Sequence, residues 1–228
     1  YKANRLEEDG EGEEEPDTLT PQIPILLDLL DAFGIPLVGA DDYEADDVMA
    51  TYAVTEPGPV RIVTGDRDLF QLVNDDPDVQ VIYLAKGISQ HDLVNRDWIS
   101  KKYEIPGDRY GLFATFRGDP SDGLPGVKGI GEKGAALIAR HYESAEDAIK
   151  GALADHEHLS PALRKKIIEG QEYLKFAPKL VACATDVPLP KIDLSIPKKP
   201  KSLDEINKYK EEYNLGASID RLISALNW

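Results

Sequence analysis

Apolar positions in the first ninety residues follow two spacings. A spacing of three or four positions predicts a helix that begins after Pro21 and ends at Gly34. Continuous apolar runs predict buried strands at 35–38, 60–64 and 79–84, and helical patterns at 43–54 and 69–73 separate them. This alternation of strand and helix is typical of a parallel α/β sheet with right-handed crossovers.

The pattern changes after about Asp92. From there to residue 180 the chain predicts successive helices joined by short Gly/Pro turns, and four prolines between 185 and 200 indicate an extended connector. Two short helices are expected from near Ser202 and Ser218. We therefore predict an α/β core within residues 1–92, a helical subdomain at 93–184, and a connector with C-terminal helices packing on the core at 185–228.

Composition narrows the class of protein. Hydrophobic residues make up 42% of the 228 residues, and no apolar run is long enough to cross a bilayer. A single cysteine, Cys183, excludes an internal disulfide framework and suits a reducing cytoplasm. Because the chain begins at Tyr1 and its one methionine is Met49, we expect it to start inside a longer protein.

The charge balance is acidic, with 26 basic against 42 acidic residues and a net charge of −16. A nucleic-acid binder normally carries a basic footprint, so this sum argues weakly against nucleic acid. Much of the excess is local, because residues 7–17 form an acidic, Gly-containing run that is typical of a solvated loop. The other acids gather in tight clusters that need a separate explanation.

Two acidic clusters are expected at one edge of the predicted sheet. Glu44, Asp46 and Asp47 follow the first predicted strand, and Asp66 and Asp68 follow the second. Ligands of open parallel sheets bind outside the carboxyl ends of the strands. Five carboxylates brought toward one point repel one another when ionised. A hard divalent cation such as Mg²⁺ or Mn²⁺ would relieve that repulsion, so the clusters indicate a metal site.

Helix capping is the alternative explanation for these acids, since Asp and Glu are common at helix N-termini. Capping explains one cluster readily, but two clusters at the same edge are harder to explain, because one acid per helix suffices. For Asp41 and Asp42 we keep a capping or loop role. A third acidic group contains Asp119 and Asp122 within residues 118–123 and by itself predicts a turn.

A glycine-rich loop follows this turn and leads into an apolar helical run. The backbone at Gly129 and Gly131 can approach a ligand closely, and the N–H groups of the following helix can face a phosphate. Such a loop contacts nucleic-acid backbone without reading bases. A tight helix–helix turn is the alternative. The predicted DNA-binding residues are Gly126, Lys128, Gly129, Gly131, Lys133 and Gly134.

Taken together, these motifs appear in a recognisable order, at residues 1–5, 44–47, 64–68, 118–122 and 126–133. Over roughly residues 1–190 the chain resembles the bacterial and phage 5′→3′ exonuclease (flap endonuclease) family, which includes the 5′-nuclease domain of bacterial DNA polymerase I. The resemblance implies a PIN-like α/β nuclease core followed by a helix-hairpin-helix subdomain. It also implies DNA hydrolysis in primer removal and repair.

The resemblance assigns roles to individual residues. Lys2 and Arg5 match the base of a helical arch whose basic residues reach the scissile phosphate, and residues 1–20 are its acidic remnant. The family's first strand, with a metal-binding Asp, would precede Tyr1, and the family often has Asn where this chain has Gly123. The hairpin would bind K⁺ through backbone carbonyls. Two or three Mg²⁺ or Mn²⁺ ions would be held by Glu44, Asp46, Asp47, Asp66, Asp68, Asp119 and Asp122.

The expected protein is thus a stand-alone, monomeric bacterial 5′-nuclease of the cytoplasm and nucleoid, with no membrane partner. Its substrates would be DNA with 5′ flaps or 5′ ends, and RNA primers on DNA, cleaved by two-metal hydrolysis. Three alternatives stay open: a non-catalytic branched-DNA-binding homologue, the 5′-nuclease domain of a polymerase, and a metal-dependent endoribonuclease of a compact α/β type. The retained acids argue against the first, and the glycine hairpin argues against the last.

Overall fold

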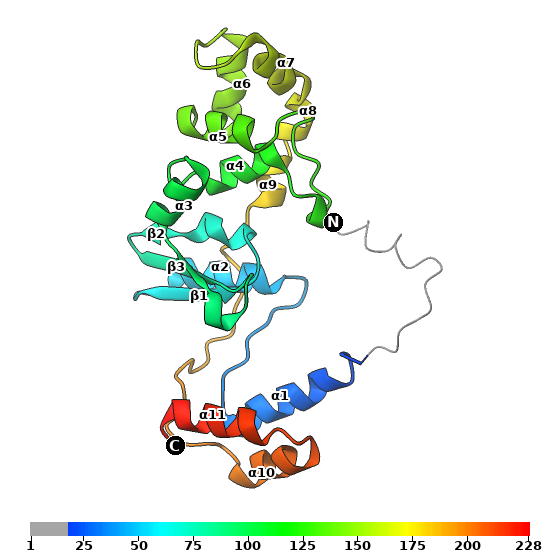
Figure 1. Cartoon of the computed structure of the whole chain (residues 1–228), viewed down its shortest axis with the longest axis vertical. Coiled ribbons are helices and arrows are strands. Elements are labelled where there is room, and N and C mark those ends of the chain that lie inside the picture. The colour runs from blue at the N-terminus through cyan, green and yellow to red at the C-terminus, as the bar shows by residue number, and fades with distance from the viewer. Residues whose placement is uncertain (1–17) are drawn as a thin grey trace, which may run out of the picture. The chain divides into compact units, whose positions relative to one another are not determined.

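A computed structural model describes residues 18–228. Within that range the chain forms two compact units (Figure 1). One unit contains residues 42–187, and the other combines residues 18–41 with residues 188–228.

A four-stranded sheet lies in the first unit. Its strands are β1 (Val60–Thr64), β2 (Asn74–Asp75), β3 (Asp78–Tyr83) and β4 (Asp92–Val94). Strands β1 and β3 are parallel, with Val60 opposite Val79 and Thr64 opposite Tyr83. Both β2 and β4 pair with β3 in the antiparallel sense. Since β1 occupies one edge of β3, the two short strands share its other edge, and the sheet is mixed rather than wholly parallel.

Helices make up most of the rest of this unit, as the sequence predicts. Side-chain caps define several of their starts: Asn95 accepts the Trp98 N–H at 2.8 Å, and Ser144 accepts the Asp147 N–H at 3.1 Å. The helices are α2 (Ala45–Thr55), η2 (Asp68–Leu72), η3 (Ile88–Gln90), α3 (Arg96–Tyr103), α4 (Tyr110–Arg117), η4 (Pro120–Asp122), α5 (Glu132–His141), α6 (Ala145–Leu153), α7 (Pro161–Glu169), α8 (Gln171–Leu174) and α9 (Ala177–Val181).

An aromatic cluster joins the sheet to η2, α3 and α4. The fully buried Phe70 ring meets Tyr83, Trp98 and Tyr110 edge-on, with centroids 5.0, 5.6 and 5.2 Å away. Because Phe70 lies two residues after Asp68 in η2, this packing fixes the backbone that carries the second acidic cluster.

The second unit is a small helical cluster of α1 (Gln22–Phe33), α10 (Leu203–Glu212) and α11 (Gly216–Leu226). Phe33, Ile206 and Ile219 are its buried centre, together with Ala32. The predicted ends of the first helix and the two predicted C-terminal helices are confirmed.

The strand predicted at residues 35–38 is wrong, because the structure assigns no strand there. Gly34 ends α1 in the left-handed conformation, and the Ile35 N–H donates to the Leu30 carbonyl at 3.0 Å, as in a helix-terminating turn. Ile35 then packs against the small helical cluster. An apolar run after a helix therefore completes that helix's packing instead of adding a strand.

The domain boundaries predicted at residues 92 and 184 stay predictions. The structure groups the chain differently, since sheet and hairpin helices fall in one compact unit and residues 188–228 pack with residues 18–41. None of the helices in the described range combines the length and apolar character that crossing a bilayer requires.

Candidate metal centre and nucleic-acid interface

An acidic cavity of about 460 Å³ lies in the first unit and brings together parts of all three acidic groups. Residues of α9 and of the segment that follows it complete the lining, including Lys179 and Cys183. The acidic residues that line it are Glu44, Asp46, Asp47, Asp68 and Asp122.

The first cluster begins α2. Glu44 is the N-cap, and Asp47 completes a capping box in which its Oδ2 accepts the Glu44 N–H at 3.1 Å. Capping is therefore part of the role of these two acids, as the alternative reading proposed. Asp46 is half-buried and also lines the cavity.

The second cluster forms the turn between β1 and η2. Thr64 Oγ1 accepts the Asp66 N–H at 3.0 Å, and Asp66 Oδ1 accepts the Asp68 N–H at 2.9 Å. Burial raises the pKa of Asp68 to about 7, and the charges of Asp66, Asp122 and Asp119 add to this rise. The second and third clusters thus interact electrostatically, although more than fifty residues separate them in sequence.

The third cluster sits on a tight turn, as predicted. Asp119 and Leu124 exchange two backbone hydrogen bonds of 2.9 Å, and Arg117 pairs with Asp119 at 3.5 Å. Asp122 is buried, with 8% of its surface exposed. Gly123 has φ +73°, a conformation that Gly and Asn tolerate best, so glycine fits the backbone at this position.

Within residues 18–228, no three His, Cys, Asp or Glu side chains already converge as ligands of a single ion. The structure gathers the carboxylates in one cavity without setting a coordination geometry. The metal-binding role of the seven predicted acids therefore stays a prediction, and Lys2 and Arg5 lie outside the described residues.

The turn with the third cluster is packed directly against the glycine loop. Gly118 and Gly126 both have positive φ, +76° and +65°, and a side chain at Gly118 would place its Cβ 2.4 Å from the backbone nitrogen of Gly126. Only glycine allows this crossing. Gly126 is buried by it, so its role in the structure is to couple the acidic turn to the loop.

The loop itself presents its remaining residues at the surface. Lys128, Gly129, Gly131 and Lys133 are exposed, and Gly131 is the N-cap of α5. Gly134 faces inward, where an added Cβ would meet the Ile130 side chain at 3.0 Å. The first N–H groups of α5 have no partner within the helix, which suits a phosphate ligand.

Lys166 of α7 supports this loop, and the sequence pattern did not indicate it. Its Nζ donates to the Gly129 carbonyl at 2.7 Å, and Gly129 has φ +79°. The contact spans 37 residues, so no local signal could have identified it. The predicted K⁺ at this hairpin stays a prediction, and one hairpin carbonyl already has a cationic partner.

Sequence reasoning also missed the α9 side of the acidic cavity. Cys183 has no neighbour of catalytic type along the chain, yet it lines the same cavity as the acids. Burial, followed by the charges of Asp46, Asp47 and other acids, raises the pKa of its thiol to about 12. The thiol therefore stays protonated and is a poor nucleophile at neutral pH.

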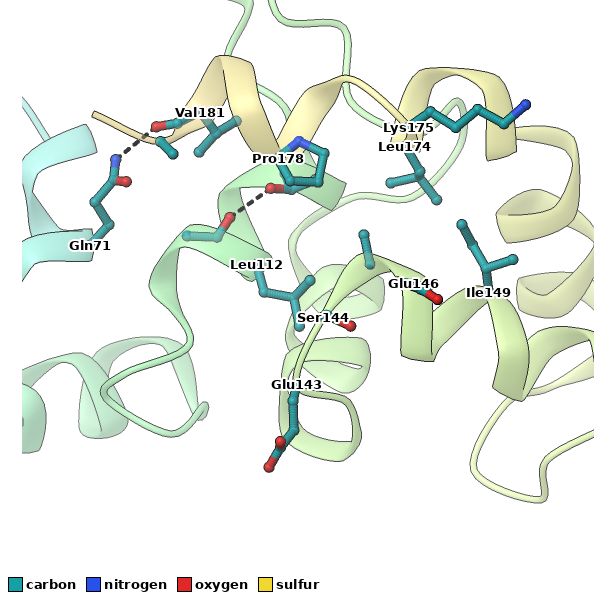
Figure 2. A pocket seen from close by; sticks show the side chains of 14 residues that line it. Gln71, Leu112, Glu143, Ser144, Glu146, Ile149, Leu174, Lys175, Pro178 and Val181 are labelled. Carbon is teal, nitrogen blue, oxygen red and sulfur yellow. Dashed lines mark hydrogen bonds between the residues drawn. The ribbon is translucent and has the colours of Figure 1, made fainter. Parts of the chain in front are cut away.

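A larger cavity of about 640 Å³ lies beside α4, α6, α8 and α9 (Figure 2). Its lining is mostly apolar, and its two acids are both ion-paired, Glu143 with Arg109 and Glu146 with Lys150. It does not carry the chemistry that the acidic clusters predict.

An acid-lined cavity beside an α/β sheet, followed by a hairpin that presents backbone N–H groups, is typical of metal-dependent nucleases. Comparison with known proteins also indicates a nuclease. Residues 1–104 match the family model of the 5′-3′ exonuclease N-terminal resolvase-like domain, and residues 105–208 match that of the 5′-3′ exonuclease C-terminal SAM fold.

Individual relatives give the same result. A 5′-3′ exonuclease of Streptomyces coelicolor is 44% identical over 99% of this chain and 76% of the relative. DNA polymerase I of Mycobacterium tuberculosis is 34% identical over 99% of this chain but only 24% of the polymerase. In fold, the chain matches a bacteriophage T5 flap endonuclease solved with DNA and metal ions, with a TM-score of 0.63, 22% identity, and coverage of 81% of this chain and 67% of that one.

The chain belongs to the 5′-3′ exonuclease family. This confirms the resemblance read from its motifs and the predicted fold class, a nuclease core followed by a helical domain. It also confirms the predicted structure-specific 5′-nuclease function at the level of the family.

Proposed function

We propose that this protein hydrolyses DNA phosphodiesters at 5′ flaps and 5′ ends, using two or three Mg²⁺ or Mn²⁺ ions. The observation that carries the proposal is the acidic cavity, which receives carboxylates from three separate segments of the chain. Carboxylate oxygens are the ligands that these hard cations favour. The pKa of Asp68 is raised first by burial and then by the charges of Asp66, Asp122 and Asp119, and a bound cation would offset that negative charge.

The ions and the residues around them would have different roles in the reaction. Divalent ions at such a site lower the pKa of water and stabilise the leaving oxygen. Arg117 orients Asp119 through its ion pair, and Cys183, held protonated, offers no competing nucleophile. Lys2 and Arg5 would offset charge on the phosphate oxygens, as the resemblance implies. Of the seven predicted acids, Asp47 would hold the backbone through its two hydrogen bonds, and the ligands would be Glu44, Asp46, Asp66, Asp68, Asp119 and Asp122.

The glycine loop would hold the duplex through its phosphates. Exposed Lys128 and Lys133 flank the start of α5, where helix N–H groups add to the attraction for anions. Such contacts are independent of base sequence, as a flap nuclease needs. We further propose that the hairpin binds K⁺ and that the enzyme also acts on RNA primers paired with DNA. We propose that the protein is a monomer and that it acts at the nucleoid.

A substrate panel tests this proposal. A 5′-labelled flap, a recessed 5′ end and a single-stranded RNA would be incubated with protein and Mg²⁺ or Mn²⁺, and with EDTA as the control. We expect metal-dependent cleavage of both DNA substrates and none of the RNA. Tight flap binding without cleavage in either metal would indicate a non-catalytic homologue, and preferential RNA cleavage would indicate an endoribonuclease.

A further inference from the structure

Residues 181–187, the end of α9 and the segment after it, are held against α2 by two side chains of α2. The Ala184 N–H donates to Asp47 Oδ1 at 2.8 Å, across 137 residues of sequence. The Val187 N–H donates to Thr51 Oγ1 at 3.2 Å, and Thr51 is buried, with 4% of its surface exposed. Asp47 and Thr51 are one helical turn apart, so a single face of α2 makes both bonds.

Gln71 holds the same segment from η2. Its Nε2 donates to the Val181 carbonyl at 2.8 Å, which Figure 2 shows, and its Oε1 accepts the Cys183 N–H at 3.4 Å. The same Nε2 also donates to the Asp68 carbonyl at 2.8 Å. Gln71 therefore links the turn that carries Asp68 to residues 181–183, which line the acidic cavity.

Asp47 has both carboxylate oxygens engaged by backbone N–H groups: Oδ1 by Ala184 and Oδ2 by Glu44. An ion at either oxygen would draw the carboxylate away from these bonds, and losing the bond to Ala184 would leave a part-buried donor unsatisfied. We propose that Asp47 is a positioning residue and not a metal ligand. With Thr51 and Gln71 it anchors residues 181–187, of which residues 181–183 line the catalytic cavity, an inference that rests on the proposed nuclease function.

The single cysteine reports on this anchor. Cys183 is partly buried within the anchored segment, so release of the segment exposes its thiol to a reagent such as DTNB. Labelling of the metal-free protein at fixed pH should accelerate roughly five- to thirtyfold in Gln71→Ala and Asp47→Ala, the range expected for one or two lost part-buried hydrogen bonds. Asp47→Asn keeps an oxygen for Ala184 and should label more slowly than Asp47→Ala.

Asp46→Asn is the matched control for charge. Asp46 raises the pKa of the Cys183 thiol more than Asp47 does, so this variant measures how much labelling gains from removing a neighbouring carboxylate alone. Gln71→Ala removes no charge at all. Labelling rates of Gln71→Ala and Asp47→Ala no higher than that of Asp46→Asn would overturn the anchoring.

The affinity for Mn²⁺ then shows whether Asp47 is a positioning residue or a metal ligand. In calorimetric titration with Mn²⁺, Asp47→Asn should stay within roughly threefold of the wild type, whereas Asp46→Asn should lose roughly tenfold or more. Equal losses in the two variants would make Asp47 a ligand and overturn the inference. If the wild type neither binds Mn²⁺ nor cleaves DNA, the proposed function fails, while thiol labelling, which needs neither metal nor DNA, still decides the anchoring.

Discussion

Replacing Asp68 with Asn should stabilise the metal-free protein above neutral pH while abolishing cleavage. The pKa of Asp68 is raised from its usual 3.8 to about 7, mainly by burial and then by Asp66, Asp122 and Asp119. Asn keeps the size of the side chain without the charge. The native state would therefore be relieved of an unfavourable buried carboxylate.

The direction of the pH effect on stability follows from the linkage between proton binding and folding. A carboxyl group with a raised native pKa binds its proton more tightly in the folded than in the unfolded state, so its stabilising effect is full below about pH 4 and is lost as pH rises through about 7. A rise of about three pH units corresponds to about 4 kcal/mol without screening. Because Asp68 is only half-buried, solvent reduces this to about 1–2 kcal/mol, or roughly 2–8 °C in melting temperature.

Thermal melts of both proteins between pH 4 and pH 8 measure this effect. In EDTA the two curves should meet near pH 4 and separate toward pH 8, with the variant melting higher. Added Mg²⁺ should raise the melting temperature of the wild type at pH 8 and leave the variant nearly unchanged. A variant that melts at or below the wild type at pH 8 in EDTA would refute the electrostatic reasoning.

Further predictions concern the hairpin and its junction with the acidic turn. Lys128→Ala combined with Lys133→Ala should weaken binding to branched duplexes of any sequence and reduce the slope of log affinity against log salt by roughly 0.9 per lost contact, while cleavage at saturating DNA changes little. An unchanged slope in a salt titration would show that residues other than these two lysines contact the DNA phosphates. Gly118→Ala should destabilise the protein by about 2 kcal/mol or more in denaturant melts, because its Cβ would meet the backbone of Gly126; a neutral effect would contradict the tight crossing. Lys166→Met should weaken duplex binding without changing the salt slope as much as the double lysine variant does, because Lys166 holds Gly129 rather than a phosphate.

Local patterns in the sequence predicted much of the fold. The strand at 60–64 and the first helix were recognised from apolar spacing and from Gly34, because these signals are encoded within a few neighbouring residues. The strand expected at 35–38 failed for the same reason. Whether Ile35 pairs in a sheet or packs against helices depends on residues near 206 and 219, which periodicity does not report.

The candidate site, like the fold, could be predicted from local motifs but not from long-range contacts. Acid clusters and the glycine loop were visible as motifs, and the structure brings Asp68 and Asp122 into one cavity. The contribution of α9 and the bond from Ala184 to Asp47 depend on contacts across more than a hundred residues. Asp47 lies within a recognisable motif, yet its neighbours in space, not its motif, indicate its role.

The central claim is that three distant segments form one catalytic centre, and single-turnover flap cleavage tests it most directly. Asp46→Asn, Asp68→Asn and Asp122→Asn each remove a carboxylate from a different segment, and the triple variant removes all three. Residues that act as a unit lose activity non-additively, so each single variant should lose nearly as much rate as the triple variant, with flap binding retained within about tenfold. Near-normal cleavage by any one of the three single variants would contradict a shared centre.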